Sequence, residues 1–171
     1  GSEGLLFVPH LGGRVCPNEP HISGAWIGLT WSHGWAHMYR AMLESVAYEY
    51  AIYLDIERRL AGDTVFTEVR AVGGGSRSPL WNQIKANVLG IPYVQLNRPE
   101  VGALGTAILA GFGVGVFDDW EAAVNRFIWE VRRYEPDPEA TRRYREYVAA
   151  YRELLEEHRP LWERVSRLRR P

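Results

Sequence analysis

The sequence predicts an α/β fold with a largely parallel sheet, organised as one domain over residues 1–171. Short apolar stretches alternate with helical ones along the chain, which is the pattern of strands joined by helices. In the middle of the chain, an apolar stretch leads through three consecutive glycines into an amphipathic stretch. With 46% hydrophobic and 24% charged residues, a chain of 171 residues can build a buried core.

The first part of the chain predicts a short strand, a loop and a long helix. Residues 5–11 are apolar, and residues 12–24 are rich in glycine, proline and other loop formers. Thr30 or Ser32 can cap a helix over residues 35–60. Apolar residues recur in that helix mostly at spacings of three and four, so one face should be buried. They are Met38, Ala41, Met42, Val46, Ala47, Tyr50 and Leu54.

Proline, glycine and aspartate mark the boundaries of the later elements. Pro79 suits the first position of a helix that Gly90 ends. Asp118 or Asp119 can cap a further helix. Strands are expected at 65–72 and 93–96, and helices at 79–89, 101–115, 118–128 and 136–171, the last a charged tail that breaks or kinks at Pro160.

The most informative feature is the glycine turn, Gly73-Gly74-Gly75, between a predicted strand and a predicted helix. Glycine permits positive φ and lets a ligand come close to the main chain. A helix that starts after such a turn directs free N–H groups at the ligand. Ligands in open α/β sheets bind beyond the carboxyl ends of strands. The turn is therefore predicted to hold a nucleotide, and the alternative is a tight turn without a ligand.

Familiar nucleotide and catalytic motifs do not fit this turn. A P-loop requires a lysine that is absent here. A dinucleotide fingerprint requires glycine where Ser78 stands and an acid near Asn97, which disfavours an NAD-dependent oxidoreductase. A hydrolase elbow lacks its second glycine.

Two other patterns favour structural roles. His33 and His37 are four residues apart, but Gly34 stands where a metalloprotease motif requires glutamate, so no metal site is expected. The segment 97–107 is rich in small residues and should pack closely against the sheet or the next helix. These residues are Gly102, Ala103, Gly105 and Ala107.

Charge and composition exclude several classes of function. The formal net charge is −1, and the arginines of the tail alternate with glutamates at helical spacing, so no nucleic-acid partner is expected. No apolar run approaches the length of a membrane span, so no membrane partner is expected either. The single cysteine, Cys16, suits a reducing compartment and predicts a cytoplasmic protein.

Three segments resemble the C-terminal domain of FGGY carbohydrate kinases, and most closely its xylulokinase branch. They are GLLFVPHLGGRVCPNEPHISGAWIGLTWSHGWAHMYRAMLESVAY, VGGGSRSPLWNQIKANVLGIP and RPEVGALGTAILAG. The resemblance covers about residues 4–157 in the order and spacing of that family. One departure is the segment Gly12–Pro17, which lacks the acidic residue usual before Arg14.

The resemblance implies an actin-like ATPase or ribonuclease-H-like domain, the C-terminal half of a two-domain sugar kinase. The domain would be truncated at its N-terminal hairpin and would end in the helical tail 136–171. The implied reaction transfers the γ-phosphate of ATP, with Mg²⁺ bridging the phosphates, to a hydroxyl of a sugar or polyol. D-xylulose is the expected sugar, although glycerol, L-ribulose and gluconate kinases share these segments.

The family's glycine turn lies against the adenosine, which identifies the predicted nucleotide-binding residues. They are Gly73, Gly74, Gly75, Ser78 and Pro79. Asn82 and Gln83 are expected to support that site rather than to touch the nucleotide. No catalytic residue is expected in this chain, because the family's general base lies in the other domain.

The chain is expected to be a fragment that is inactive by itself and binds ATP weakly. The alternative is a non-catalytic, kinase-derived module for oligomerisation or ligand sensing, with Trp26, Trp31 and Trp35 at an interface. Both interpretations allow a homodimer.

Overall fold

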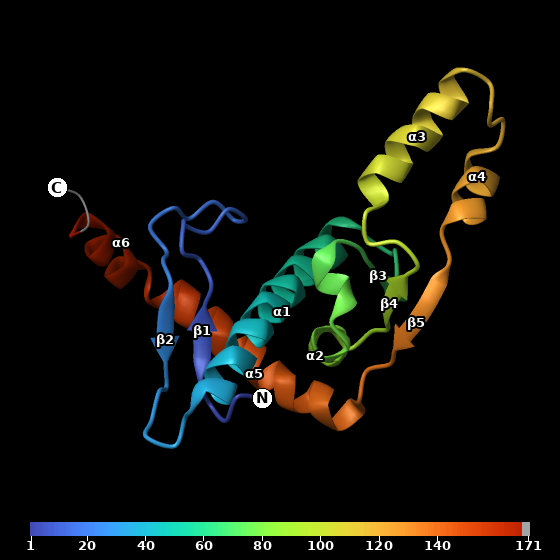
Figure 1. The fold of residues 1–171 in the computed structure, drawn as a ribbon. Coiled ribbons are helices and arrows are strands. Elements are labelled where there is room, and N and C mark those ends of the chain that lie inside the picture. The colour runs from blue at the N-terminus through green and yellow to red at the C-terminus, as the bar shows by residue number, and fades with distance from the viewer. Residues whose placement is uncertain (169–171) are drawn as a thin grey trace.

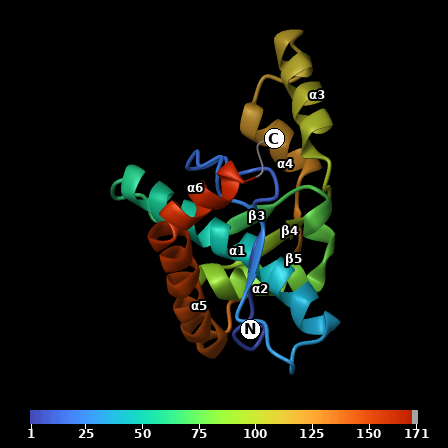
Figure 2. The same cartoon turned by 90° about the vertical axis from the view of Figure 1, so that its left-hand side faces the viewer.

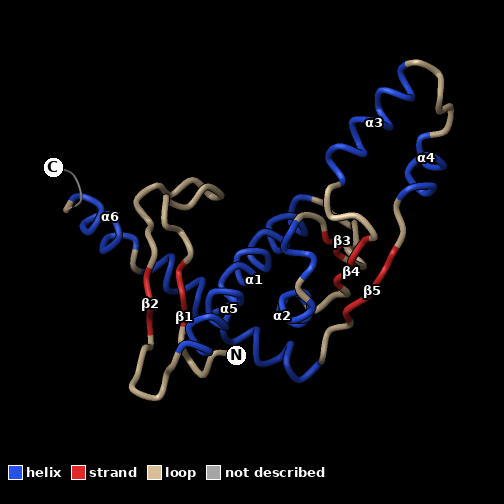
Figure 3. Tube along the Cα trace, viewed as in Figure 1, coloured by secondary structure: helices blue, strands red, loops and turns tan. Residues whose placement is uncertain are grey.

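Two small sheets lie on either side of a group of packed helices in the computed structural model, which describes residues 1–168 (Figure 1). The strands are β1 (Leu6–Val8), β2 (Ala25–Ile27), β3 (Val69–Ala71), β4 (Tyr93–Leu96) and β5 (Glu130–Tyr134). The helices are α1 (Trp35–Leu60), α2 (Pro79–Leu89), α3 (Val101–Gly113), α4 (Trp120–Phe127), α5 (Pro138–Glu157) and α6 (Arg159–Arg167). Figure 3 shows that helices make up most of the chain.

The prediction of a largely parallel sheet is wrong. Strands β3 and β4 are parallel, but β5 pairs with β4 in the antiparallel direction, and β1 and β2 form a separate antiparallel pair. The prediction missed β2 and β5. Four of the five residues of β5 are exposed and three of them are charged, so the strand lacks the apolar alternation that predicts a half-buried strand.

Helix α1 has the predicted bounds but a different cap and a more polar buried face. Gly34 is its N-cap, and the side chain of His37 accepts a hydrogen bond from the Gly34 N–H at 3.0 Å. Thr30 and Ser32, the two predicted caps, lie in the preceding turn, so neither of them caps the helix. Met42 and Tyr50, expected on the buried face, are exposed, while Glu44 and Glu49 are buried.

The buried carboxylate of Glu44 joins α1 to α5. It accepts hydrogen bonds from Tyr144 on α5 at 2.6 Å and from Arg40 one turn earlier at 2.6 Å. Burial by itself would raise the pKa of Glu44, but these two hydrogen bonds, together with the positive charges of the chain's N-terminus and of Arg40, outweigh it and lower the pKa. The carboxylate therefore stays charged and holds the two helices together at neutral pH.

Glu49, also on α1, joins three parts of the chain. It accepts hydrogen bonds from Tyr151 on α5 at 2.7 Å and from Arg14 at 3.1 Å, and it contacts His10 at 3.0 Å. Burial favours a higher pKa for Glu49, but its hydrogen bonds with His10 and Tyr151 and the charge of Arg14 lower the pKa. Arg14 also binds Glu19 at 2.9 Å, so a second carboxylate helps to hold its charge within the domain.

The charged tail begins after β5 and packs on α1 rather than standing free. Its expected i,i+4 ion pairs are present, as between Glu139 and Arg143 at 3.5 Å. The opposite side of α5 buries Tyr144 and Tyr151 against α1. The predicted break occurs at His158, and Pro160 lies in the first turn of α6. The end of the predicted tail, 169–171, lies outside the described residues.

The remaining predictions need smaller corrections. The strand expected at 65–72 is reduced to Val69–Ala71, and the helix expected at 101–115 ends at Gly113. Asp119, rather than Asp118, caps α4, because its carboxylate accepts a hydrogen bond from the Ala122 N–H at 2.9 Å. Within residues 1–168, none of the helices combines the length and the apolar character needed to cross a membrane.

Replacing Glu44 by glutamine should lower the free energy of unfolding near pH 7 by about 2–4 kcal/mol, because the charged acceptor is lost from a buried network. A lowered folded-state pKa means that the carboxylate stabilises the fold above its ordinary value of 4.5. This stabilisation is lost as the pH falls through the lowered pKa. The difference between Glu44→Gln and the unmodified chain should therefore shrink in acid, as measured by urea unfolding at several pH values.

The matched control is Glu139→Gln on the exposed side of α5, which removes a solvent-exposed ion pair. Little change is expected from it at any pH. Equal destabilisation by the two substitutions would contradict the role assigned to Glu44.

Candidate functional site

The glycine turn lies at the carboxyl end of β3, as the sequence predicts. Gly73 has φ of +80°, which favours glycine. Residues Gly74–Arg77 form a short 3₁₀ helix, and α2 then begins at Pro79. The predicted passage from strand to glycine turn to helix is thus confirmed.

Side chains beneath the turn hold its shape. The Ser76 hydroxyl donates to the Gly73 carbonyl at 2.7 Å, and the Asn82 amide donates to the Ser76 carbonyl at 2.7 Å. Both Ser76 and Asn82 are buried. Asn82 therefore supports the turn from α2. Gln83, the other expected support, instead donates to Asn87 and to the carbonyl of Glu135.

The three glycines have different surroundings. A Cβ atom added to Gly73 or Gly74 would meet no atom within 4 Å, so their main chain faces open space. A Cβ atom added to Gly75 would lie 2.9 Å from the ring of Trp81. The indole N–H of Trp81 donates to the Leu43 carbonyl at 2.9 Å, which keeps that ring in place. Gly75 is thus explained by packing, whereas Gly73 and Gly74 leave room for a ligand.

Ser78 and Pro79 shape the start of α2. The Ser78 hydroxyl oxygen accepts a hydrogen bond from the Trp81 N–H at 3.3 Å, as an N-cap does. Pro79 occupies the first turn, where its missing N–H is no loss. Their contact with a nucleotide remains a prediction.

The second glycine-rich segment meets the turn at one end. The Gly73 N–H donates to the Pro99 carbonyl at 2.8 Å, and Arg77 forms an ion pair with Glu100 at 2.7 Å. Beyond Glu100, α3 extends away from the sheet and packs chiefly against α4. The expected close packing of the small residues is therefore not found: Gly102, Ala103 and Ala107 are exposed, and a Cβ atom added to Gly102 or Gly105 would meet no atom within 4 Å.

Lys85, on α2, is a buried cation that the sequence did not single out. Its ammonium group lies 3.9 Å from the ring centre of Trp81 and 5.1 Å from that of Tyr93 on β4. Burial lowers its pKa to about 8. Lys85 thus links α2 to the sheet behind the glycine turn. In the sequence, a lysine within an amphipathic helix is expected on its exposed side. The spacing of apolar residues therefore could not predict that Lys85 is buried.

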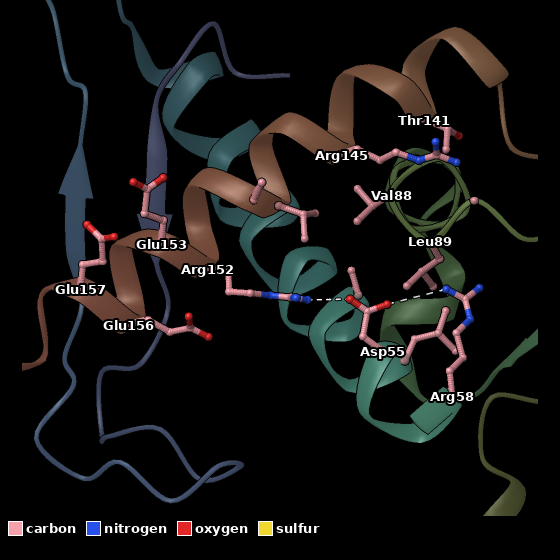
Figure 4. Close-up of a pocket in the computed structure, with 15 residues that line it drawn as sticks. Asp55, Arg58, Val88, Leu89, Thr141, Arg145, Arg152, Glu153, Glu156 and Glu157 are labelled. Carbon is pink, nitrogen blue, oxygen red and sulfur yellow. Dashed lines mark hydrogen bonds and ion pairs between the residues drawn. The ribbon is translucent and has the colours of Figure 1, made fainter. Parts of the chain in front are cut away.

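A separate cavity of about 550 Å³ lies between α1, α5 and the carboxyl-terminal end of α2 (Figure 4). Asp55 lies in it between two arginines, bound to Arg152 at 2.6 Å and to Arg58 at 3.8 Å. None of the predicted nucleotide-binding residues lines this cavity. The glycine turn adjoins the opposite, amino-terminal end of α2. The cavity is therefore distinct from the predicted site.

His33 and His37 serve the backbone at the start of α1. The Nδ1 atom of His33 accepts a hydrogen bond from the Thr30 N–H at 2.9 Å, and His37 makes the corresponding bond to Gly34. His33 precedes the helix, so the two residues do not share a helical face. Across residues 1–168, no group of three or more His, Cys, Asp or Glu side chains is placed to hold a metal ion.

Comparison with known proteins identifies the family to which this arrangement belongs. Residues 1–114 match the model of the C-terminal domain of the FGGY family of carbohydrate kinases. The chain belongs to this family. The match includes β1, β2, α1, β3, the glycine turn, α2, β4 and α3, and so contains the whole candidate site.

Similar proteins include several kinds of sugar kinase. The chain is 31% identical to the xylulose kinase of Staphylococcus epidermidis over 162 residues, covering 94% of this chain and 32% of that protein. It is 35% identical to the gluconokinase of Bacillus subtilis over 147 residues, covering 85% and 28%. The ligand-bound xylulose kinase of Lactobacillus acidophilus matches with a TM-score of 0.80 and 27% identity, covering 92% and 32%. The chain thus spans about a third of the length of these relatives.

Alanine substitutions should separate the structural glycine from the open one. Gly75→Ala should lower the free energy of unfolding by about 1–3 kcal/mol, because the methyl group would displace the anchored ring of Trp81. Gly74→Ala should change it by less than about 0.5 kcal/mol, because that position is open. Chemical unfolding of both variants checks this. Equal changes in the free energy of unfolding would show that the ring of Trp81 does not exclude a side chain at position 75.

Proposed function

We propose that this chain is the nucleotide-binding part of a cytoplasmic, ATP-dependent sugar kinase with an actin-like, ribonuclease-H-like fold. Membership in the FGGY family supports the class of reaction. The observation that carries the proposal within the structure is the glycine turn at the end of β3, with open space over Gly73 and Gly74. An added Cβ atom at either glycine meets no atom within 4 Å, which supports the approach of a nucleotide to that main chain.

The residues at the turn fit an adenosine better than a triphosphate. The turn has no lysine for the phosphates, and its one charged side chain, Arg77, is paired with Glu100. Gly73, Gly74 and Gly75 would let the backbone pass along the nucleoside, with Ser78 and Pro79 at its edge. Asn82 and Ser76 would keep the turn in shape when the nucleoside binds.

Bound MgATP would supply the γ-phosphoryl group, which passes to a hydroxyl of the sugar. We assign this chain the positioning of the nucleotide, and we place the general base and the sugar-binding residues in the part of the kinase that the chain does not span. Such a division of roles is sufficient for phosphoryl transfer, because positioning and charge stabilisation account for most of that catalysis.

D-xylulose is the proposed sugar. The xylulose kinases of Staphylococcus epidermidis and Lactobacillus acidophilus match more than nine tenths of the chain. The gluconokinase of Bacillus subtilis has a higher identity over a shorter stretch, so gluconate is the direct competitor in the test.

The protein produced from its native gene should phosphorylate D-xylulose with a kcat/KM at least about tenfold higher than that for gluconate or glycerol, a difference of roughly 1.4 kcal/mol between transition states. A coupled assay of ADP release with a panel of sugars measures this. Faster phosphorylation of gluconate would correct the sugar and keep the reaction. No phosphorylation of any sugar would favour the non-catalytic module.

The 171-residue chain by itself should bind MgATP weakly, with a Kd above about 1 mM, because one side of a two-domain site makes few contacts. Calorimetric titration measures this. In the native gene product, Gly74→Leu should weaken MgATP binding at least about tenfold by filling the open space at the turn. Ala150→Leu, on the exposed side of α5, is the matched control. Tight binding to the chain alone would contradict the predicted weak affinity, and equal affinities of the two variants would contradict the proposed site.

A further inference from the structure

The ammonium group of Lys85 is buried among aromatic rings from three elements. Lys85 lies on α2, which packs against both α1 and β4 (Figures 1 and 2). Its Nζ atom is 3.9 Å from the ring centre of Trp81 on α2, 5.1 Å from that of Tyr93 on β4 and 5.6 Å from that of Tyr50 on α1. At such distances an ammonium group is attracted to the face of an aromatic ring.

No carboxylate compensates the charge of Lys85 among residues 1–168. Burial is the only influence on its pKa, so the neighbouring elements α5, β5 and the glycine turn present no charged group close enough to change it. The titratable residues that contact the ammonium are Tyr50 on α1 and Tyr93 on β4. Burial and Tyr50 raise the pKa of Tyr93 to about 12. A buried charge without a counter-charge costs stability, so the stability of the fold does not explain Lys85.

The ring of Trp81 joins Lys85 to the glycine turn. Its indole N–H donates to the Leu43 carbonyl at 2.9 Å. Its six-membered part lies against Gly75, where the Cζ3 atom would be 2.9 Å from an added Cβ atom. The ammonium of Lys85 contacts the same ring. The ring is thus fixed by one hydrogen bond, by the backbone of the turn and by one charge, and the charge is the contact that a proton can remove.

A shift of the Trp81 ring would reach the part of the turn that faces open space. The Ser76 N–H donates to the Gly73 carbonyl at 3.1 Å, so these two residues close the turn around Gly74 and Gly75. Gly75 contacts the ring, and Gly74 has no atom within 4 Å of an added Cβ atom. The ring therefore lies behind the main chain that is open to a nucleotide.

We propose that Lys85 is a positioning residue for the nucleotide: its charged ammonium group holds the ring of Trp81 against Gly75 and so keeps the glycine turn in the shape that binds ATP. This assignment rests on the proposed function and adds to it a dependence of the affinity on one proton. ATP is an anion, and an ammonium group without a counter-charge behind the turn also favours an anion. Both effects make ATP bind best when Lys85 is charged.

The affinity and the stability should change with pH in opposite directions. Burial lowers the pKa of Lys85 from 10.5 to about 8, so between these values the unfolded chain binds more protons at this residue than the folded chain does. The contribution of Lys85 to the free energy of unfolding therefore rises with pH over this range. The affinity for MgATP should fall there, because the charged form is lost. A residue that serves packing alone would change the stability and leave the affinity unchanged.

The test measures the Kd of MgATP for the native gene product by calorimetric titration from about pH 7 to about pH 9.5. In the unmodified protein the Kd should rise about fivefold over this range, the effect of one desolvated contact between a cation and an aromatic ring. Lys85→Met should bind more weakly at pH 7 and show no further rise. Lys85→Arg, whose guanidinium stays charged, should also show no rise.

Arg132→Met is the matched control. Arg132 is an exposed cation on β5, 4.9 Å from the ring centre of Tyr134, so its removal deletes the same kind of contact away from the turn. It should change neither the Kd nor the pH dependence of the Kd. A second readout needs no nucleotide: hydrogen exchange of the Gly73 and Ser76 amides, which are hydrogen-bonded. Lys85→Met should speed their exchange about fivefold at the same pH.

Three results would overturn the proposal. They are a Kd of the unmodified protein that does not change with pH, the same rise of the Kd in Lys85→Met or Lys85→Arg as in the unmodified protein, and an equal weakening by Arg132→Met. The first result needs no variant, so a variant that fails to fold does not remove the test. Absence of MgATP binding at every pH would refute the proposed function. Exchange of the Gly73 and Ser76 amides would then still decide whether Lys85 holds the turn.

Discussion

The fold depends on two buried carboxylates of α1, Glu44 and Glu49. Each is charged because tyrosines of α5 and nearby basic groups bind it, and together they hold α1, α5 and the N-terminal segment in one frame. Buried charges are costly when a partner is removed, so the network also specifies how these helices align. Helix α2 packs against that frame and brings the glycine turn to the end of β3.

The glycine turn shows why three identical residues need separate explanations. Gly75 is required because the ring of Trp81 leaves no room for a side chain. Ser78 and Pro79 are explained by their places at the start of α2. Gly73 and Gly74 face open space on a turn that Ser76 and Asn82 hold in shape. A rigid turn with an open face is suited to a nucleoside, and FGGY family membership gives that geometry its chemical context.

Helix positions and the strand-to-glycine-turn passage could be predicted from the sequence, because proline, glycine and apolar periodicity act locally. Strands β2 and β5 could not be predicted in this way. Strand β2 has three residues and is defined by its pairing with β1. Strand β5 is held by pairing with β4 and carries charged, exposed side chains. The buried face of α1 was also misjudged, since Glu44 and Glu49 are stabilised by residues about a hundred positions away. Helix α3 carries no charged residue and yet is largely exposed, so its composition did not predict its surroundings.

The central claim is that the open face of the glycine turn binds the adenosine of ATP. Photolabelling of the native gene product with 8-azido-ATP, followed by digestion with trypsin, tests it most directly. Cleavage after arginine and lysine releases residues 71–77 and 78–85 as separate peptides. The account predicts that the label lies on these peptides and is lost when excess ATP competes. A competed label confined to peptides that line the cavity between α1, α2 and α5, such as 146–152, would contradict it.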